Sequence, residues 1–213
     1  RQWAIGIRNS LIISLGNVVL CLVTAFPAAY IFTRARFMAD KHLFFWFLSQ
    51  RLAPPAVFIV PFFMIYLSIG LYDTLLGVII VHSIFNLPLA VWILSGFRKE
   101  IPTSIDEAAF IDGHNIFGFW RRIFIPQLVP ALGVTAFFNW MFSWTEMLIA
   151  SMVTRNVAFP LTVQLLLTRS SMLWGVLYGQ AAAAGVISMI AGVIMLYFVR
   201  HYIVRGFMLG GKV

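Results

Sequence analysis

The residues of this sequence best able to do chemistry are polar side chains set inside apolar stretches. The apolar stretch 127–150 contains four of them, spaced by four, four and three positions: Thr135, Asn139, Ser143 and Glu146. On an α-helix this spacing places all four on one face. Hydroxyl, amide and carboxylate groups there can exchange hydrogen bonds with a hydroxyl-rich solute, so the face is a candidate wall of a solute pathway.

An alternative interpretation gives the same residues a structural role. Glu146 lies about 20 residues past Pro126, close to the far end of a helix that would cross a membrane of ordinary thickness, where water can reach it. Asn139 and Ser143 can equally join helices by hydrogen bonds. Because a charge isolated in hydrocarbon costs several kcal/mol, an intramembrane acid usually faces a cavity or a partner. We therefore treat Glu146 as a candidate functional residue and leave both interpretations open.

Arg51 is the only cation well inside an apolar stretch, at 43–69. Pairing with Glu146 would remove two costly charges at once, so we expect Arg51 either to pair with Glu146 or to contact the solute. Snorkelling of its side chain to a membrane surface is the alternative. His82 and Asn86 share a helical face further along. Asn86 is a further pathway candidate, whereas a lone histidine is expected to pack between helices.

The sequence offers no candidate for catalysis or for metal binding. An HExxH motif, paired catalytic aspartates, a GxSG-type nucleophile with a histidine and a GxxxxGK[ST] phosphate loop are all missing. Cys21 is the single cysteine, and no second His or Cys stands at metal-ligand spacing. We expect no catalytic residue, no metal site and no cofactor bound by this chain.

These polar residues are exceptions in a strongly apolar chain. Of 213 residues, 62% are hydrophobic and 10% charged, and the mean hydropathy is +0.94. Apolar blocks of about 20 residues can cross a bilayer as helices, which also satisfy their own backbone polar groups. The sequence predicts an all-α integral membrane protein, one domain over residues 1–213, with five transmembrane helices. Their expected ranges are about 10–32, 43–69, 75–97, 127–150 and 180–203.

The basic residues are distributed unevenly between the two ends of these helices. One side has ten: Arg34, Arg36, Lys41, Arg98, Lys99, Arg121, Arg122, Arg200, Arg205 and Lys212. The other has four: Arg1, Arg8, Arg155 and Arg169. The positive-inside rule places the first side in the cytoplasm. Since the chain begins with Arg, we expect a further span upstream, six in the full protein. The net charge of +8 is spread between apolar blocks and forms no basic face for nucleic acid.

The polar stretch 98–126 is expected to be a cytoplasmic loop with structure of its own. Ser104 can cap the start of a helix and Glu107 can return the bond in a capping box, so a short helix is expected to begin near Ile105. Gly113 can adopt the left-handed conformation that ends a helix.

The apolar side chains of this loop have no lipid to bury them. Ala108 and Ala109 leave one face of the first short helix nearly flat. A second short helix is expected at about 117–124, before Pro126, and bulky side chains accompany both helices: Phe110, Ile111, Phe117 and Trp120. Such a surface suits docking of a helix into a groove of a partner protein. An amphipathic hairpin lying on the membrane surface is the alternative.

The residues of the loop stand in a known arrangement: Glu107-Ala108-Ala109, three residues, Gly113, nine residues, Ile123, one residue, Ile125-Pro126. This resembles the EAA loop of ABC importer permeases, whose pattern is EAA, x3, G, x9, I, x, LP, with Ile125 for Leu as the single departure. Nearly the whole chain resembles the maltose-type permeases of the carbohydrate uptake group, including the stretch 29–37. The stretch 51–55 followed by Pro61 resembles the polyol, glycerol and trehalose branch in particular.

The resemblance implies a type I ABC importer permease fold and a multi-pass protein of the bacterial cytoplasmic (inner) membrane. It also implies that the loop docks on an ATP-binding subunit dimer, with Glu107 as a polar contact and Gly113 as the bend. The other coupling residues carried over from the motif are Ala108, Ala109, Ile123 and Pro126. ATP and Mg would then be bound by the partner ATPase.

The expected activity is import of a sugar or polyol by alternating access. The partners that the resemblance implies, besides the ATPase and membrane lipid, are an external substrate-binding protein and a second permease subunit. That second subunit would form a heterodimer with this chain, although the residues themselves leave a homodimer open. A secondary transporter of a small polar solute is the alternative, because polar residues in broken helices suit that class too.

Overall fold

The computed structural model describes residues 2–34, 40–171 and 178–210, so Arg1, Arg36 and Lys212, which entered the charge count above, lie outside the described residues. The described residues form helices joined by turns, and the all-α prediction is confirmed. Four helices are long and apolar enough to cross a membrane: α1 (Gln2–Arg34), α4 (Leu75–Lys99), α7 (Ile125–Thr145) with the helical turns just before it, and α10 (Tyr178–Gly210). They lie over four of the five expected stretches.

The remaining stretch, expected at 43–69, is a broken helix rather than one straight span. It is divided into α2 (Asp40–Ser49), two short 3₁₀ turns, η1 (Gln50–Leu52) and η2 (Pro55–Phe58), and α3 (Ile59–Ser68). Its two halves are bent by 89°. Pro54 and Pro55 cause the break, because proline has no N–H to continue a helix and disfavours helical geometry in the residue before it.

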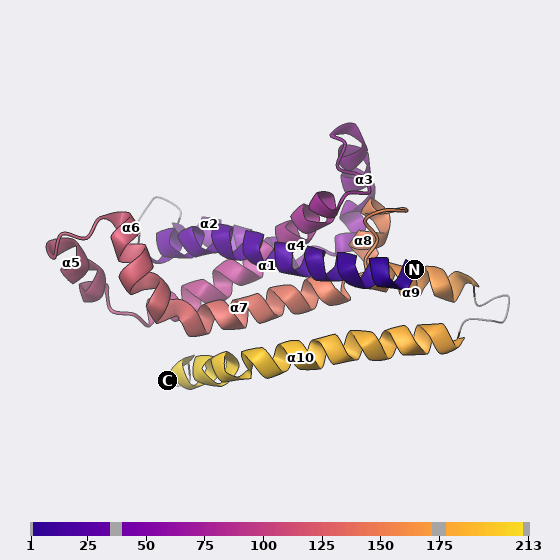
Figure 1. Ribbon diagram of the computed structural model, residues 1–213. Helices are drawn as coiled ribbons and strands as arrows, with labels where there is room; N and C mark the ends of the chain where they lie inside the picture. Colours follow the sequence, from indigo (N-terminus) through magenta and orange to yellow (C-terminus); the bar gives the residue numbers. More distant parts are fainter. Residues whose placement is uncertain (1, 35–39, 172–177, 211–213) are drawn as a thin grey trace.

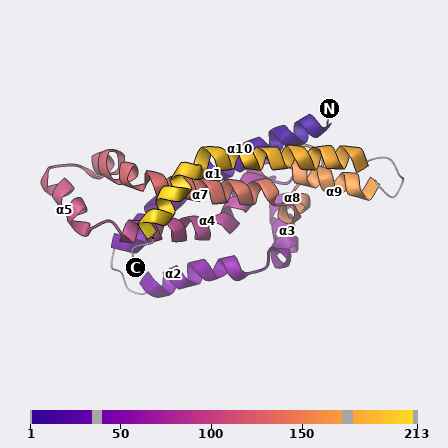
Figure 2. The same ribbon diagram turned by 90° about the horizontal axis from the view of Figure 1, so that it is seen from below.

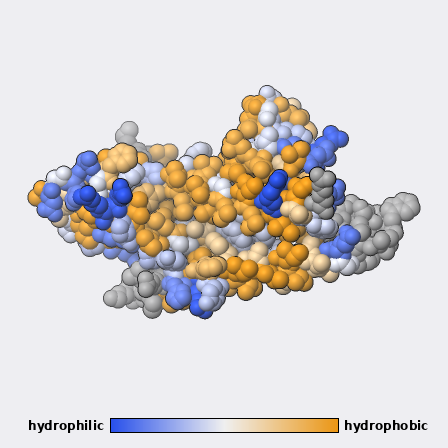
Figure 3. All heavy atoms as spheres, in the orientation of Figure 1, coloured by the Kyte–Doolittle hydropathy of each residue, from blue (hydrophilic) through white to orange (hydrophobic). Residues whose placement is uncertain are grey.

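The helices α1, α4 and α7 form the centre of the molecule (Figure 1). Figure 2 shows α2 and α10 on opposite sides of this centre. Small and apolar side chains fill the contact between the central helices, for example Cys21, Ala25, Ala90 and Ala131, each less than 2% exposed. Their apolar outer surface, seen in Figure 3, is what helices surrounded by lipid present.

The helix α10 approaches α7 closely at Gly133. A Cβ placed on Gly133 would lie 2.7 Å from the Cβ and Cγ of Tyr202. The missing side chain therefore lets the two helices pack there, as small residues do at contacts between membrane helices.

The end of the molecule that contains the start of α1 also holds α3, α8 (Leu148–Val153) and α9 (Leu161–Ser171) (Figure 1). Asp73, in the turn before α4, binds this region together. Its carboxylate accepts hydrogen bonds from the backbone N–H groups of four successive residues, 155–158, at 2.9 to 3.1 Å. Asp73 adopts a left-handed backbone conformation with φ 56°, which aspartate tolerates better than most residues.

Partial burial raises the pKa of Asp73, but the backbone N–H donors outweigh it, so the pKa lies below its ordinary value. The turn before α4 and the segment 155–158 are thus held together by one ionised carboxylate.

Candidate functional site

The loop expected at 98–126 lies at the opposite end of the molecule and contains two short helices. The first, α5, runs from Thr103 to Ile111. The expected capping box is wrong: Pro102 precedes the helix in an extended conformation, so Ser104 already lies within the first turn and caps nothing. Gly113 ends this helical unit with φ +81°, as predicted, and no atom would obstruct a Cβ there. The left-handed backbone is what the position requires of glycine.

The second helical unit of the loop continues directly into the membrane helix. It begins at α6 (Ile116–Phe119), capped by Asn115, whose side-chain oxygen accepts from the N–H of Gly118 at 2.7 Å. A π-helix, η3 (Trp120–Phe124), then joins it to α7 without a turn. Pro126 therefore does not end a separate helix. It lies at the start of α7, directly after the π-helix, so the helical run passes through this proline, which cannot donate a backbone hydrogen bond there.

The motif residues divide into an outward and an inward set. Glu107 and Ala108 are exposed, whereas Ala109 is 2% exposed and packs in the core below the loop. Ile123 packs against the same core, and Pro126 is exposed. Of the two alanines on the flat face, Ala109 packs inside the chain and Ala108 remains accessible to a partner.

Large apolar side chains remain uncovered on the loop. Ile111 is 84% and Phe117 81% exposed, far more than apolar side chains of their size usually are in a folded protein. A concave surface beside them is lined by Gly113, His114, Asn115, Phe117, Gly118, Arg121 and Arg122. The loop therefore presents apolar anchors next to a basic hollow, which suits a protein partner.

The loop is attached to the membrane helices by an ion cluster that the sequence did not reveal. Asp106 on α5 is paired with Arg34 at the end of α1 and with Arg98 in the last turn of α4. Arg98 is completely buried. Arg98 is only eight residues from Asp106 in the sequence, but Arg34 is 72 residues from it. No local sequence pattern relates residues so far apart.

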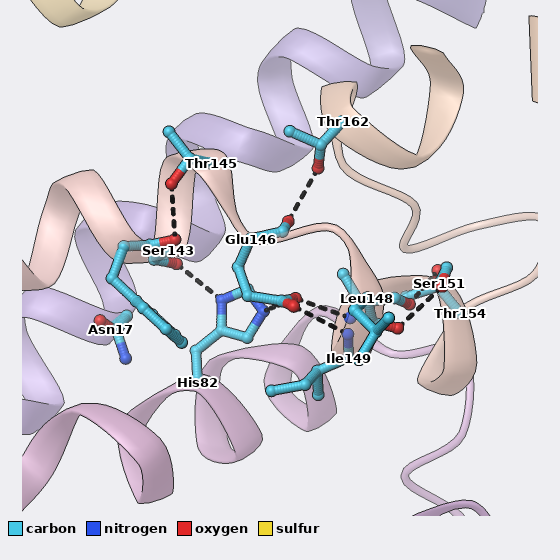
Figure 4. A network of polar contacts seen from close by, with 12 residues as sticks. Asn17, His82, Ser143, Thr145, Glu146, Leu148, Ile149, Ser151, Thr154 and Thr162 are labelled. Carbon is cyan, nitrogen blue, oxygen red and sulfur yellow. Dashed lines mark hydrogen bonds and ion pairs between the residues drawn. The ribbon is translucent and has the colours of Figure 1, made fainter. Parts of the chain in front are cut away.

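Inside the membrane helices, Glu146 is placed differently from the expectation. The helix α7 ends at Thr145, and Glu146 has an extended backbone, so it leaves the face shared by Asn139 and Ser143. Its carboxylate turns to the start of α8 and accepts from the N–H groups of Ile149 and Ala150 at 2.9 and 3.0 Å (Figure 4).

His82, expected only to pack between helices, is the partner of Glu146. Its Nε2 lies 3.3 Å from the nearer carboxylate oxygen, close enough for an ion pair although not aligned as a hydrogen bond. Its Nδ1 is 2.8 Å from the hydroxyl oxygen of Ser143, so the imidazole lies between the two residues (Figure 4). The expected pair of Glu146 with Arg51 is therefore wrong, because Glu146 meets the histidine and the start of α8 instead.

The other polar residues of the membrane helices form a buried seam. The side-chain amides of Asn17 and Asn86 are hydrogen-bonded at 2.8 Å, and the Asn86 amide also lies 3.3 Å from the backbone oxygen of Asn139. Ser83 adds a contact to Asn17 at 3.0 Å. Asn86, Asn139 and Ser143 are at most 2% exposed, so in this conformation they join α1, α4 and α7 as the structural interpretation held.

Arg51 is the pathway candidate that the structure leaves exposed. It lies in η1, at the break of the second stretch. One guanidinium nitrogen donates to the carbonyl of Phe85 at 2.9 Å, and the guanidinium stands 4.8 Å from the ring centroid of Phe142. Pro88 removes the helical donor for the carbonyl of Ile84, the neighbour of Phe85. Among the described residues, no group of His, Cys, Asp and Glu is arranged to hold a metal ion.

Comparison with known proteins agrees with this geometry. A family model described as binding-protein-dependent transport system inner membrane component matches residues 22–208. The trehalose transport system permease protein SugB of Mycobacterium tuberculosis is 33% identical over 150 residues, which cover 70% of this chain and 55% of that protein. The osmoprotective compounds uptake permease protein GgtD of Synechocystis is 30% identical over 207 residues, which cover 95% of this chain and 68% of that protein.

A solved structure shares the fold. A chain of a bacterial ABC transporter involved in the import of the acidic polysaccharide alginate superposes with a TM-score of 0.72 and 21% identity, over 94% of this chain and 75% of that chain. The family match covers most of the sequence, and the long apolar helices fit it. The chain belongs to the binding-protein-dependent transport system inner membrane component family and is the permease subunit of an ABC importer in the cytoplasmic membrane, a transport component and not an enzyme.

Proposed function

We propose that this permease imports a sugar or polyol, delivered by an external binding protein, and that its cytoplasmic loop couples transport to an ATPase dimer. The exposed Ile111 and Phe117 beside the Gly113 bend support this most directly. The ATPase would receive these side chains in a groove and contact Glu107, which is exposed on the same helix. ATP and Mg are assigned to the ATPase, and a second permease subunit completes a heterodimer.

The proposed cargo class is supported by the relatives. The named cargo of one of them is trehalose, and that of two others is diacetylchitobiose. The polyol part of the proposal depends on the stretch 51–55 and Pro61. Since specificity is shared with the binding protein, uptake by the complete importer is the measurement that identifies the cargo.

The break at 50–55 is proposed as this chain's part of the solute pathway. Gln50 and Arg51 are exposed there, and polar groups at membrane depth belong against a water-filled cavity or a protein partner. In this arrangement the second permease supplies the opposite wall. Asn86, Asn139 and Ser143 lie behind the wall and keep α4 and α7 in place, so they act on the cargo only through the shape of the pathway.

The coupling proposal is tested with the complete importer in proteoliposomes. We would compare uptake of a panel of sugars and polyols, with and without ATP, for the wild type and for Gly113→Pro. Proline cannot adopt the φ of +81° found at Gly113, so the bend should be lost and ATP-dependent uptake with it. Glu100→Gln, an exposed acid outside α5, is the matched control. Uptake that proceeds without ATP and tolerates Gly113→Pro would refute the proposal.

A further inference from the structure

Asp106 ties the cytoplasmic loop to the ends of two long helices. Arg34 is the last residue of α1, and its Nε lies 2.7 Å from Oδ2 of Asp106. Nη2 of Arg98, in the last turn of α4, donates to the same oxygen. Both guanidinium groups also donate to the carbonyl of Ile101, at 2.7 Å from Arg34 and 3.3 Å from Arg98. One carboxylate and one carbonyl therefore hold α1, α4 and α5 together.

This cluster is enclosed by protein rather than lying on the surface. Arg98 is 0% and Asp106 6% exposed. The guanidinium of Arg98 stands 4.9 Å from the ring centroid of Phe124 and 5.8 Å from that of Tyr30. Phe124 belongs to the π-helix that leads into α7, so a fourth element meets the cluster. A buried arginine is tolerated only while it is paired, which keeps these four elements in fixed positions relative to Asp106.

The other inward contacts of α5 are apolar, and Ala109 is the buried one, in the core below the loop. Within the described ranges, Asp106 is the side chain of α5 that is hydrogen-bonded to α1 and α4. Phe110 makes a ring contact with Phe119 at 5.2 Å between centroids. Ala108 and Ile111 are exposed on the side available to a partner. A force applied to the exposed face of α5 therefore reaches the long helices through the polar link at Asp106 and the small apolar contact of Ala109, and among the described residues of α5 only Asp106 is bonded to both α1 and α4.

We propose that Asp106, Arg34 and Arg98 are positioning residues that convert displacement of α5 into movement of α1 and α4. This rests on the proposed docking of α5 on the ATPase. The three residues touch neither cargo nor nucleotide. Without the link, the ATPase would still bind the loop and hydrolyse ATP, but the membrane helices would follow its movement less completely.

Arg34→Gln is the informative variant because it spares the buried pair. Asp106 keeps Arg98, and the Arg34 side chain is 15% exposed, so the chain should fold. In proteoliposomes with the complete importer, we would measure assembly, ATP hydrolysis and uptake of the panel sugar that the wild type takes up fastest. Assembly and hydrolysis should persist, while uptake per ATP should fall by roughly two- to thirtyfold, the range by which residues of a coupling network change it.

Two further variants separate a coupling role from a structural one. Arg34→Lys should restore part of the lost uptake per ATP, because it keeps the charge but lacks the planar guanidinium whose Nε and Nη2 bond to Asp106 and Ile101. Arg200→Gln, an exposed cation on α10, should match the wild type. If Arg34→Gln only lowers the amount of assembled importer and leaves uptake per ATP unchanged, the proposal is wrong. A wild type with no ATP-dependent uptake would instead overturn the coupling function on which it rests.

Discussion

Glu146 contacts several helices at once. Its carboxylate accepts two backbone N–H groups at the start of α8 and faces the imidazole of His82. Its backbone carbonyl accepts from the hydroxyl of Thr162 at 2.9 Å, which brings α9 to the same point. The residue thus connects α4, α7, α8 and α9.

Replacing Glu146 by alanine should destabilise the protein markedly. The substitution leaves the N–H groups of Ile149 and Ala150 without their acceptor and removes the carboxylate that faces His82, at a cost of about 2–4 kcal/mol. Thr145→Ala is the matched control, because Thr145 is exposed and its hydroxyl bonds only to carbonyls of its own helix. Thermal unfolding in detergent should show a lowered midpoint for Glu146→Ala alone. Equal midpoints for the two variants would contradict this account.

The carboxylate of Asp73, which joins the turn before α4 to the segment 155–158, predicts that the stability of the protein depends on pH. Its pKa is depressed in the folded protein, so the carboxylate adds stability at all pH values above its unfolded pKa. That contribution is lost as pH falls through the folded pKa, which lies below the ordinary value of 3.8. Asp73→Asn should therefore unfold at a lower temperature than the wild type at pH 7, and the difference should shrink towards pH 3. A difference that stays constant across this range would rule out the ionised carboxylate as its cause.

The residues of the candidate sites could be predicted only in part from the sequence. The stripe of Asn139 and Ser143 follows from helical spacing and is present. Glu146 departs from it because α7 ends one residue earlier, and no helix-stop signal such as glycine or proline marks that end. The pairing of His82 with Glu146, and of Arg34 with Asp106, depends on how distant segments pack, which single-residue patterns do not contain.

At the scale of elements, Gly113 joins two helical units through its left-handed backbone. Gly113→Ala should cost about 1–2 kcal/mol, because an L side chain strains this conformation even where space is open. Gly96→Ala is a matched control: Gly96 lies inside α4, a Cβ there also meets no atom within 4 Å, and alanine favours helix. Thermal unfolding should rank Gly113→Ala below the wild type and Gly96→Ala at or above it. The reverse order would exclude backbone strain at Gly113.

The positions of the long helices were readable from hydropathy, whereas the shape of the second stretch was not. Averaging over about 20 residues identifies an apolar block but hides Pro54 and Pro55 within it. Proline interrupts the helical hydrogen bonds locally, and the 89° bend depends in addition on how η1 packs against α4. In the same way, the polar loop was recognised as a unit, but its continuous junction with α7 was missed because a π-helix has no sequence signature of its own.

The whole molecule has two distinct ends, and its orientation can be tested directly. The positive-inside count places α5 and α6 in the cytoplasm and the segment 155–158 outside. In intact cells, a cysteine at Asn156 should react with an impermeant maleimide, and a cysteine at Glu100 should react only after the membrane is opened. Both positions are exposed, and the native Cys21 is 0% exposed, so background labelling should be low. Labelling of Glu100→Cys from outside would invert the orientation.

The break between α2 and α3 also has a consequence for the cellular abundance of the subunit. If a second permease completes the pathway as proposed, the exposed Gln50 and Arg51 would face acyl chains until that subunit covers them. A polar side chain exposed to lipid resembles a folding defect, even where, as for Arg51, one of its donors is bonded within the chain. Proteases that survey the bilayer for such defects would therefore remove orphan copies, and the cellular abundance of this chain would follow synthesis of its partner. The same exposed residues that suit a transport pathway would thereby serve as a check on subunit stoichiometry.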